Sequence, residues 1–173
     1  MKLTKIALGG GCHWCTEAVF QSLKGVVKVE QGYVSSVEEN SSFSEAVIVH
    51  FNTEDISLKT LVEIHLHTHK STSNHSMRSK YRSAVYTFSE AQKEELECVI
   101  EYFQKDFDYK LITKVYPFQS FKASREAIQK YYQKDPNKPF CKTFIAPKLK
   151  YLVQKFSYQI NQSKVAHIAT TTV

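Results

Sequence analysis

The sequence predicts an α+β fold: a two-layer α/β sandwich with a ferredoxin-like β-α-β-β-α-β core and a mixed sheet. This prediction depends first on the order of segments, because stretches with strand periodicity alternate with stretches of helical periodicity. The composition agrees with it. A chain of 173 residues, 42% of them hydrophobic, is long enough to bury one core, and only five Gly and four Pro argue against long disordered stretches.

The first half of the chain supplies the strand, helix, strand, strand and helix of this core. The run Gly9-Gly10-Gly11 ends the first strand, and Gly25 stops the helix that follows. Both faces of the segment 46–51 are largely apolar, so we expect this strand at the centre of the sheet. Ser57 is a suitable N-cap for the second helix. The expected elements are a strand at 2–8, a helix at 12–23, strands at 26–34 and 46–51, and a helix from residue 58.

The second half begins with a polar loop at 70–80 and continues the alternation. We expect residues 1–160 to form one domain with a C-terminal arm that carries Cys141, and residues 161–173 to be a frayed tail, because they lack periodicity. The expected elements are a strand at 83–88, a helix capped by Ser89 that runs to Phe107, a strand at 110–116, a helix at 124–133, a loop at 135–140 and a last helix from Pro147 to Phe156.

Charge and hydropathy argue against a nucleic-acid-binding, a membrane-bound or a secreted protein. The net charge of +6 is spread along the chain with no Lys/Arg-rich run, so we expect no nucleic-acid partner and no membrane partner. The apolar stretch after the N-terminus, Ile6-Ala7-Leu8, is too short for a signal peptide. We therefore expect a cytoplasmic monomer, in which the four Cys are reactive or buried thiols rather than a disulfide framework.

Cys12 is the strongest candidate for a chemical role. It follows three glycines at the expected start of a helix, where unpaired N–H groups and the macrodipole stabilise a thiolate. Cys15 adds a second thiol three residues later, which suits a dithiol/disulfide couple. The bare motif is also compatible with a dithiol–disulfide oxidoreductase that uses Cys12 and Cys15. A metal-binding or redox-sensing module is a further alternative, for which the available ligands are His65, His67, His69 and His75.

The run Gly11-Cys12-His13-Trp14-Cys15 is followed by Glu17-Ala18. It is similar to the Gly-Cys-Phe-Trp-Gly/Cys motif of the A-type peptide methionine sulfoxide reductases, which the chain resembles. The matching pieces cover nearly the whole domain, in order and at suitable spacing. The remaining ones are Gly32-Tyr33, Ser44-Glu45-Ala46-Val47, Tyr81-Arg82-Ser83-Ala84, and the run from Gln129-Lys130-Tyr131 through Asp135-Pro136 to Phe140-Cys141.

The resemblance implies that the Cys12 thiolate attacks the sulfur of methionine S-sulfoxide, peptide-bound or free. Glu45, in a segment of Ala, Val and Ile, would be the acid that protonates the oxygen, because desolvation keeps a carboxyl protonated. Tyr33 and Tyr81 would donate hydrogen bonds to the same oxygen. Trp14 would form an apolar wall for the substrate's methyl group, beside His13.

Recycling requires a second thiol. The resemblance implies a Cys12 sulfenic acid that condenses with another cysteine, after which thioredoxin, or dithiothreitol in vitro, reduces the disulfide without any bound cofactor. Cys141 lies in the expected Pro-bounded loop and matches the family's recycling position, whereas Cys15 is one helical turn from Cys12. The sequence leaves both open as the resolving thiol.

The chain departs from the family pattern at several positions. His13 stands where the family has Phe, Ser76 falls where it has Asp, and Ile128 falls where it has a C-terminal His. The altered loop 75–80 also contains Arg78 and Lys80, which could give it a different partner or anion preference.

Overall fold

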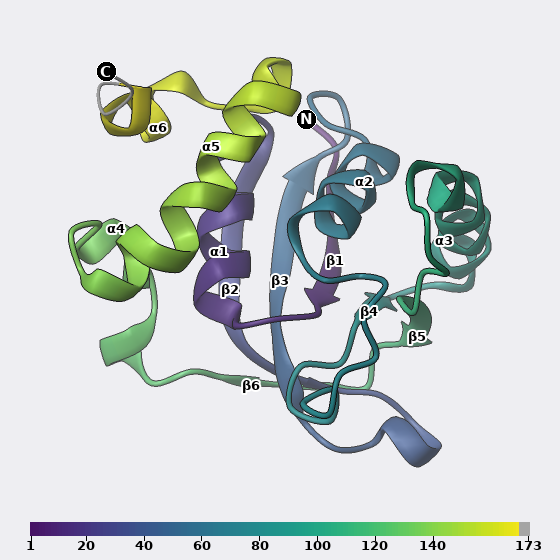
Figure 1. Cartoon of the computed structure of the whole chain (residues 1–173). Helices are drawn as coiled ribbons and strands as arrows, with labels where there is room; N and C mark the ends of the chain where they lie inside the picture. Colours follow the sequence, from purple (N-terminus) through teal and green to yellow (C-terminus); the bar gives the residue numbers. More distant parts are fainter. Residues whose placement is uncertain (170–173) are drawn as a thin grey trace.

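The computed structural model describes residues 1–169, with side chains described to residue 165. Its centre is a six-stranded mixed sheet in the order β5-β4-β1-β3-β2-β6 (Figure 1). All neighbouring strands are antiparallel except β4 and β5, which are parallel. The strands are β1 (Leu3–Gly9), β2 (Val26–Ser35), β3 (Ser44–Asn52), β4 (Ala84–Thr87), β5 (Lys114–Pro117) and β6 (Ser120–Ala123).

The core of this sheet follows the predicted β-α-β-β-α-β order. The four central strands stand in the order β4-β1-β3-β2, with α1 (His13–Gln21) between β1 and β2 and α2 (Leu58–Thr68) between β3 and β4. Ser57 caps α2, because its hydroxyl accepts a hydrogen bond from the Thr60 N–H at 3.1 Å. The α+β fold and its mixed sheet are therefore confirmed.

Helices cover one face of the sheet, where α1, α2 and α5 (Ala146–Lys155) lie in front of the strands (Figure 1). The main core lies between these two layers, and α3 (Glu90–Phe103) extends it towards β4 and β5. Alternate strand residues point to the opposite face, which holds a second, smaller cluster. That cluster consists of Ala7, Val34, Ala46, Ile48, Ala84 and Tyr86.

The helix predicted at 124–133 is wrong. The segment 120–123 pairs with β2 as a strand, and only a short 3-10 turn (Glu126–Ile128) and α4 (Tyr131–Lys134) follow. Lys130 has φ 53° and ψ 38°, a left-handed conformation that separates the two turns. A left-handed residue, whose N–H donates to the distant Glu17, therefore interrupts the predicted helix.

The loop predicted around Cys141 is also wrong. Cys141 begins a π-helical turn, Cys141–Ile145, that runs directly into α5. Pro147 lies in the first turn of α5 and lacks an N–H, so the chain loses one helical hydrogen bond there, which accounts for a wider turn before it.

The other differences concern the ends of elements. The helix from Ser89 ends at Phe103, and β5 begins at Lys114. Part of the segment expected to be frayed, Gln162–Ala169, forms α6, and residues 170–173 lie outside the described residues. None of the helices between residues 1 and 169 combines the length and apolar character that crossing a bilayer requires.

Candidate active site

Cys12 lies at the junction of β1 and α1, where it is the N-cap of the helix. Its carbonyl accepts the first helical hydrogen bonds, from the N–H groups of Cys15 at 3.1 Å and Thr16 at 3.2 Å. Gly10, just before it, has a φ of 157°, and a Cβ there would collide with the ring of His69. The turn between β1 and α1 therefore requires glycine at position 10. This turn places the Cys12 thiol at the N-terminus of α1, where the helix dipole stabilises an anion.

The thiols of Cys12 and Cys15 form an unequal pair. The Cys15 S–H donates a hydrogen bond to the Cys12 sulfur, and this bond is the main cause that lowers the pKa of Cys12. The Trp14 and Cys15 N–H groups act in the same direction, against burial and the charge of Glu45. The same S–H bond, together with burial, raises the pKa of Cys15. Cys12 is therefore the better nucleophile, and Cys15 stays a neutral thiol beside it.

Lys148 brings a positive charge to the same two thiols. It lies on α5 and lines a small cavity of about 50 Å³ together with Cys12, Cys15 and His69. Its Nζ donates a hydrogen bond to the carbonyl of Thr68 at the end of α2. Burial lowers the pKa of Lys148, whereas the charges of Cys15 and Cys12 act in the opposite direction. A partly buried ammonium in this position stabilises a thiolate.

Glu45 lies on the sheet side of Cys12. It occupies β3 directly opposite Tyr33 of β2, and its side chain is buried. Its Oε1 accepts a hydrogen bond from the backbone N–H of His13, the residue after Cys12, at 3.3 Å. The structure thus brings the predicted acid next to the predicted nucleophile, through a contact between residues far apart in the sequence.

His13 points to the sheet rather than to solvent. Its Nδ1 lies 2.8 Å from the Gly32 carbonyl oxygen, and its Nε2 lies 3.2 Å from Oε1 of Glu45. The ring of Tyr33 packs edge-on against it, with the centroids 5.2 Å apart. Burial is the main cause that lowers the pKa of His13. This residue is therefore a second buried titratable group in contact with the acid.

Lys80 and Tyr81 complete this side of the site. The Lys80 Nζ lies 3.7 Å from Oε2 of Glu45 and 5.1 Å from the ring centroid of Tyr81. The Lys80 carbonyl accepts a hydrogen bond from the Glu45 N–H at 3.0 Å, which fixes the loop against β3. We call His13, Tyr33, Glu45, Lys80 and Tyr81 the sheet wall.

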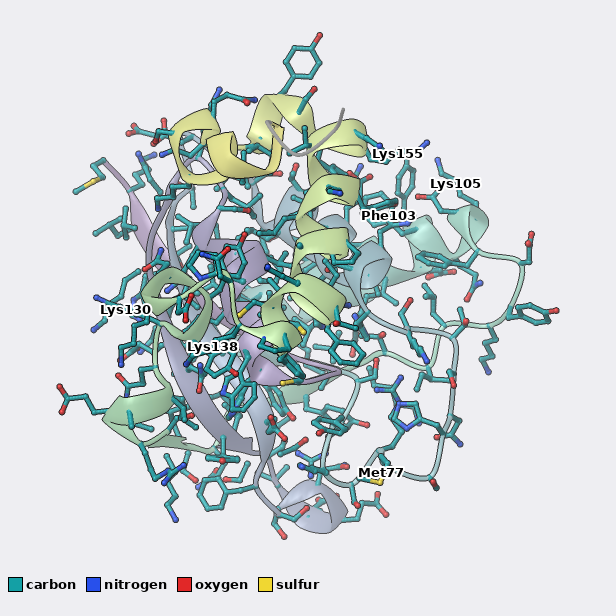
Figure 2. The ribbon with its side chains drawn as sticks, turned by 60° about the vertical axis from the view of Figure 1, so that its left-hand side comes forward. Met77, Phe103, Lys105, Lys130, Lys138 and Lys155 are labelled. Atoms are coloured by element: carbon teal, nitrogen blue, oxygen red, sulfur yellow. The ribbon has the colours of Figure 1, made fainter. Side chains whose placement is uncertain are left out.

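Trp14 faces the other way, towards the C-terminal arm, residues 124–145. Its ring stacks on Tyr131 with the centroids 4.0 Å apart and an interplanar angle of 6°, and Phe140 packs edge-on at 5.1 Å. The arm lies beside α1 (Figure 1), and Figure 2 shows Lys130 and Lys138 on it, with Met77 of the loop before Tyr81 at the lower edge of the view. The apolar surface of Trp14 is thus shared with the arm.

A buried carboxylate fastens the arm to α1. Glu17 accepts hydrogen bonds from the backbone N–H groups of Lys130 at 3.0 Å and Tyr131 at 3.1 Å, and from the side-chain amide of Gln31 at 3.1 Å. Burial is the main cause that raises the pKa of Glu17, and these three bonds oppose it. In the sequence, Glu17 stands out only as part of the motif that follows Cys12, so its contact with Lys130 and Tyr131 was not predicted.

Cys141 is fully buried in the arm, against the same core that contains Cys15. Burial raises its pKa, and its charge is one of the influences on the pKa of Cys15. Cys15 is thus the thiol that interacts with both of the others, through a hydrogen bond to Cys12 and through the charge of Cys141. We call Trp14, Cys15, Tyr131, Cys141 and Lys148 the helical wall.

The other residues that depart from the family pattern lie outside the contacts around Cys12 or hold the backbone. Ser76 is exposed in its loop, and the Ile128 carbonyl accepts a hydrogen bond from Gln31 at 3.0 Å. Arg78 donates hydrogen bonds to four backbone carbonyls, so its guanidinium holds the loop rather than offering an anion site. Those carbonyls belong to Gly10, Lys70, Ser73 and Tyr81.

Comparison with known proteins decides the family. The family model described as peptide methionine sulfoxide reductase matches residues 4–161. The chain belongs to this family. It is 34% identical to the peptide methionine sulfoxide reductase MsrA of Sulfolobus acidocaldarius over 163 residues, which cover 86% of this chain and 93% of that protein. It is also 34% identical to the MsrA of Trichodesmium erythraeum over 175 residues, which cover 92% of this chain and 99% of that protein.

Solved structures of the family agree with the fold of this reductase. Mxr1 from Saccharomyces cerevisiae in its reduced form superimposes with a TM-score of 0.73 at 25% identity, covering 83% of this chain and 91% of that one. Mxr1 in complex with Trx2 superimposes with a TM-score of 0.61 at 26% identity, covering 75% and 85%. The activity of the chain is therefore reduction of methionine sulfoxide, rather than the dithiol–disulfide exchange that the bare CxxC motif left open.

The structure gathers the sequence-predicted residues of the reductase around Cys12 but divides them between two walls. Glu45, Tyr33, Tyr81 and His13 lie on one side, and Trp14, Cys15 and Cys141 on the other. Lys148 was missed, because nothing in the sequence marks it among 23 Lys and Arg residues. Within the described residues, no three His, Cys, Asp or Glu side chains group closely enough to hold a metal.

Proposed function

We propose that this reductase acts on methionine S-sulfoxide, peptide-bound or free, through attack of the Cys12 thiolate on the sulfoxide sulfur. The observation that carries this proposal is the position of Cys12 between a thiol donor and a buried carboxyl. Cys15 donates to its sulfur, and Glu45 bonds to the N–H of the next residue, His13. A nucleophile and an acid are thus within reach of one S–O bond.

The reaction transfers one oxygen atom. The Cys12 thiolate and one proton react with the sulfoxide to give methionine and a Cys12 sulfenic acid, so that Cys12 is oxidised and the methionine sulfur is reduced. Glu45 supplies the proton to the oxygen. Tyr33, opposite Glu45 in the sheet, and Tyr81, beside Lys80, are placed on the same wall as hydroxyl donors. Trp14, on the other side of Cys12 from Glu45, borders the substrate's methyl group.

Recycling proceeds from Cys12 through Cys15 to Cys141. The neutral Cys15 thiol, already bonded to the Cys12 sulfur, condenses with the sulfenic acid and releases water. Cys141 then exchanges with Cys15, forming a Cys15–Cys141 disulfide and returning Cys12 to its thiolate. An external dithiol of the thioredoxin type reduces this disulfide, so no bound cofactor and no second copy of the chain are needed. Such a reductant favours the cytoplasm as the location.

The test of this function uses resolved R and S epimers of a methionine sulfoxide peptide, with dithiothreitol as reductant. We expect turnover of the S epimer only. Absence of turnover with the S epimer contradicts the proposal.

The recycling route is tested by mass spectrometry of disulfides after one turnover. We expect a Cys12–Cys15 disulfide in a Cys141→Ser variant and accumulation of the sulfenic acid in a Cys15→Ser variant. Cys98→Ser is the matched control, because Cys98 is exposed on α3. A Cys12–Cys141 disulfide that forms at the normal rate without Cys15 would contradict this route.

A further inference from the structure

His13 and Glu45 make a buried contact that a phenylalanine at position 13 cannot make. Their exposed fractions are 3% and 6%, and Nε2 of His13 lies 3.2 Å from Oε1 of Glu45. The contact adjoins Cys12, because His13 is the first residue of α1 and its own N–H also donates to Oε1. Two titratable groups from α1 and β3 thus meet directly beside the nucleophile.

The partners of the imidazole determine where its proton lies. Nδ1 is 2.8 Å from the Gly32 carbonyl, which can only accept, so Nδ1 carries a hydrogen and donates it. In a neutral imidazole with this tautomer, Nε2 has a lone pair and no hydrogen. Nε2 faces Oε1 of Glu45, and a bond between these two atoms needs one hydrogen. The contact therefore requires a proton, held either as a carboxylic acid with a neutral imidazole or as a carboxylate with an imidazolium.

We propose that His13 and Glu45 share a single proton, and that this pair, rather than Glu45 alone, delivers it to the sulfoxide oxygen. The inference rests on the proposed role of Glu45 as the acid. His13 is a positioning residue, because it acts through Glu45 and does not touch the reacting atoms. Burial lowers the pKa of His13, which agrees with a neutral imidazole in the resting pair.

The surroundings explain what the imidazole adds. Besides Glu45, the titratable groups around His13 are Cys12 on its own element, Tyr33 on β2 and Lys80 on the loop before β4. Lys80 lies 3.7 Å from Oε2, so a positive charge faces the carboxyl oxygen that does not contact the imidazole. The imidazole gives the proton a second binding site within the pair, so the proton stays next to Cys12 even when Glu45 is ionised.

The pair also closes the proton balance of the reaction. In the resting enzyme, the Cys12 thiol transfers its proton to the pair and becomes a thiolate. The thiolate attacks the sulfoxide sulfur and forms an S–S bond to it. As the oxygen moves to the Cys12 sulfur, this S–S bond and the S–O bond to methionine both break, and the methionine sulfur keeps the electron pair. The pair returns the same proton to that oxygen, giving methionine and a Cys12 sulfenic acid. No proton needs to enter from solvent during the step.

The experiment compares single-turnover rates of methionine S-sulfoxide reduction against pH in the wild type, His13→Gln and Glu45→Gln. Gln at 13 keeps a hydrogen bond to Glu45 but cannot hold a proton. We expect the wild-type profile to be bell-shaped, with an acid limb from Cys12 and an alkaline limb from the pair. In His13→Gln the rate falls about tenfold or more, and the alkaline limb moves about one unit to lower pH.

The control and the contradicting outcomes are distinct. His50→Gln removes a comparable imidazole, which lies 2.7 Å from Glu30 on the same sheet, and should leave the profile unchanged. Thermal unfolding of each variant checks that it folds, and His13→Asn replaces His13→Gln if the latter does not. A His13→Gln profile that superimposes on the wild type overturns the inference. An unchanged rate in Glu45→Gln instead overturns the proposed role of the acid.

Discussion

The two walls beside Cys12 are built by different means. In the sheet wall, Tyr33 and Glu45 are paired across β2 and β3, so the backbone register fixes their positions. In the helical wall, Trp14 and Tyr131 meet through stacked rings, and the arm is fastened by the carboxylate of Glu17. One wall is held by a continuous ladder of main-chain hydrogen bonds, the other by a small number of side-chain contacts.

The way each wall is held agrees with the step of the reaction that it serves. Protonating the sulfoxide oxygen needs a group held in one position, and side chains on adjacent strands provide that. Passing a disulfide from Cys12 to Cys15 and on to Cys141 needs sulfur atoms that change partners, and an arm held mainly by side-chain contacts rather than by strand pairing permits it. We therefore expect substitutions in the sheet wall to slow oxygen transfer and substitutions in the helical wall to slow recycling.

The largest effect is expected for Glu45→Gln. A Gln side chain keeps the shape of Glu45 but has no proton to give, so single-turnover reduction should fall by about 10²–10⁴-fold, as for loss of a general acid. Rapid-quench measurement of methionine formed in the first turnover checks this. The rate at which a preformed Cys12–Cys15 disulfide is reduced should be unchanged. A slower rate would show that the sheet wall also acts in recycling.

Cys141→Ser should have the next largest effect, and it should act on recycling, the step assigned to the helical wall. Thioredoxin-supported turnover should fall by about tenfold or more, because the Cys12–Cys15 disulfide then has no third thiol to exchange with and the reductant must attack it directly. Formation of methionine in the first turnover should be as fast as in the wild type. Steady-state and single-turnover rates measured on the same sample separate the two, with Cys98→Ser as the control. A slower first turnover would assign Cys141 to oxygen transfer.

Lys148→Met tests the cation of the helical wall. Removing the ammonium destabilises the thiolate, so the pKa of Cys12 should rise, by about one unit or tenfold in the thiolate fraction at neutral pH. The rate of iodoacetamide alkylation against pH measures this, and its half-point should move to higher pH. Lys164→Met is a suitable control, because Lys164 bonds to the Gln21 carbonyl at the far end of α1. A half-point that does not move would exclude Lys148 from thiolate stabilisation.

Glu17→Gln should have the smallest effect. An amide can accept fewer hydrogen bonds than a carboxylate, so one N–H of the arm loses its partner, at a cost of about 1 kcal/mol. Denaturant unfolding measures the loss, and hydrogen exchange at Lys130 and Tyr131 locates it. The variant Glu126→Gln, at an exposed residue of the same arm, is the matched control. Equal losses in the two variants would show that Glu17 does not fasten the arm.

The sequence predicted the parts of the fold that depend on local patterns. Apolar residues on both faces of the segment 46–51 placed β3 at the centre of the sheet, and Ser57 marked the start of α2. It failed at β6 and at the arm, because these take their conformation from partners far away in the chain. Ser120 pairs with Ser35, and Glu17 fixes a left-handed turn at Lys130. No window of neighbouring residues contains that information.

The candidate site divides in the same way. The family motifs identified Cys12, Glu45, Tyr33 and Tyr81, because members of the family share the arrangement of these residues in space. Contacts that are particular to this chain have no such motif and could not be predicted. His13 was expected beside the substrate's methyl group, and its ring nitrogens instead bond to Gly32 and Glu45. Lys148 reaches the thiols only because α5 crosses behind them.

The stacking of Trp14 on Tyr131 has a practical consequence. The chain contains one tryptophan, and that residue joins the helix of the nucleophile to the arm of the last thiol. Its emission depends on the aromatic ring that covers it and on the polarity around its indole. The fluorescence of Trp14 therefore reports on its contact with Tyr131, and so on the junction between α1 and the arm, without any added label.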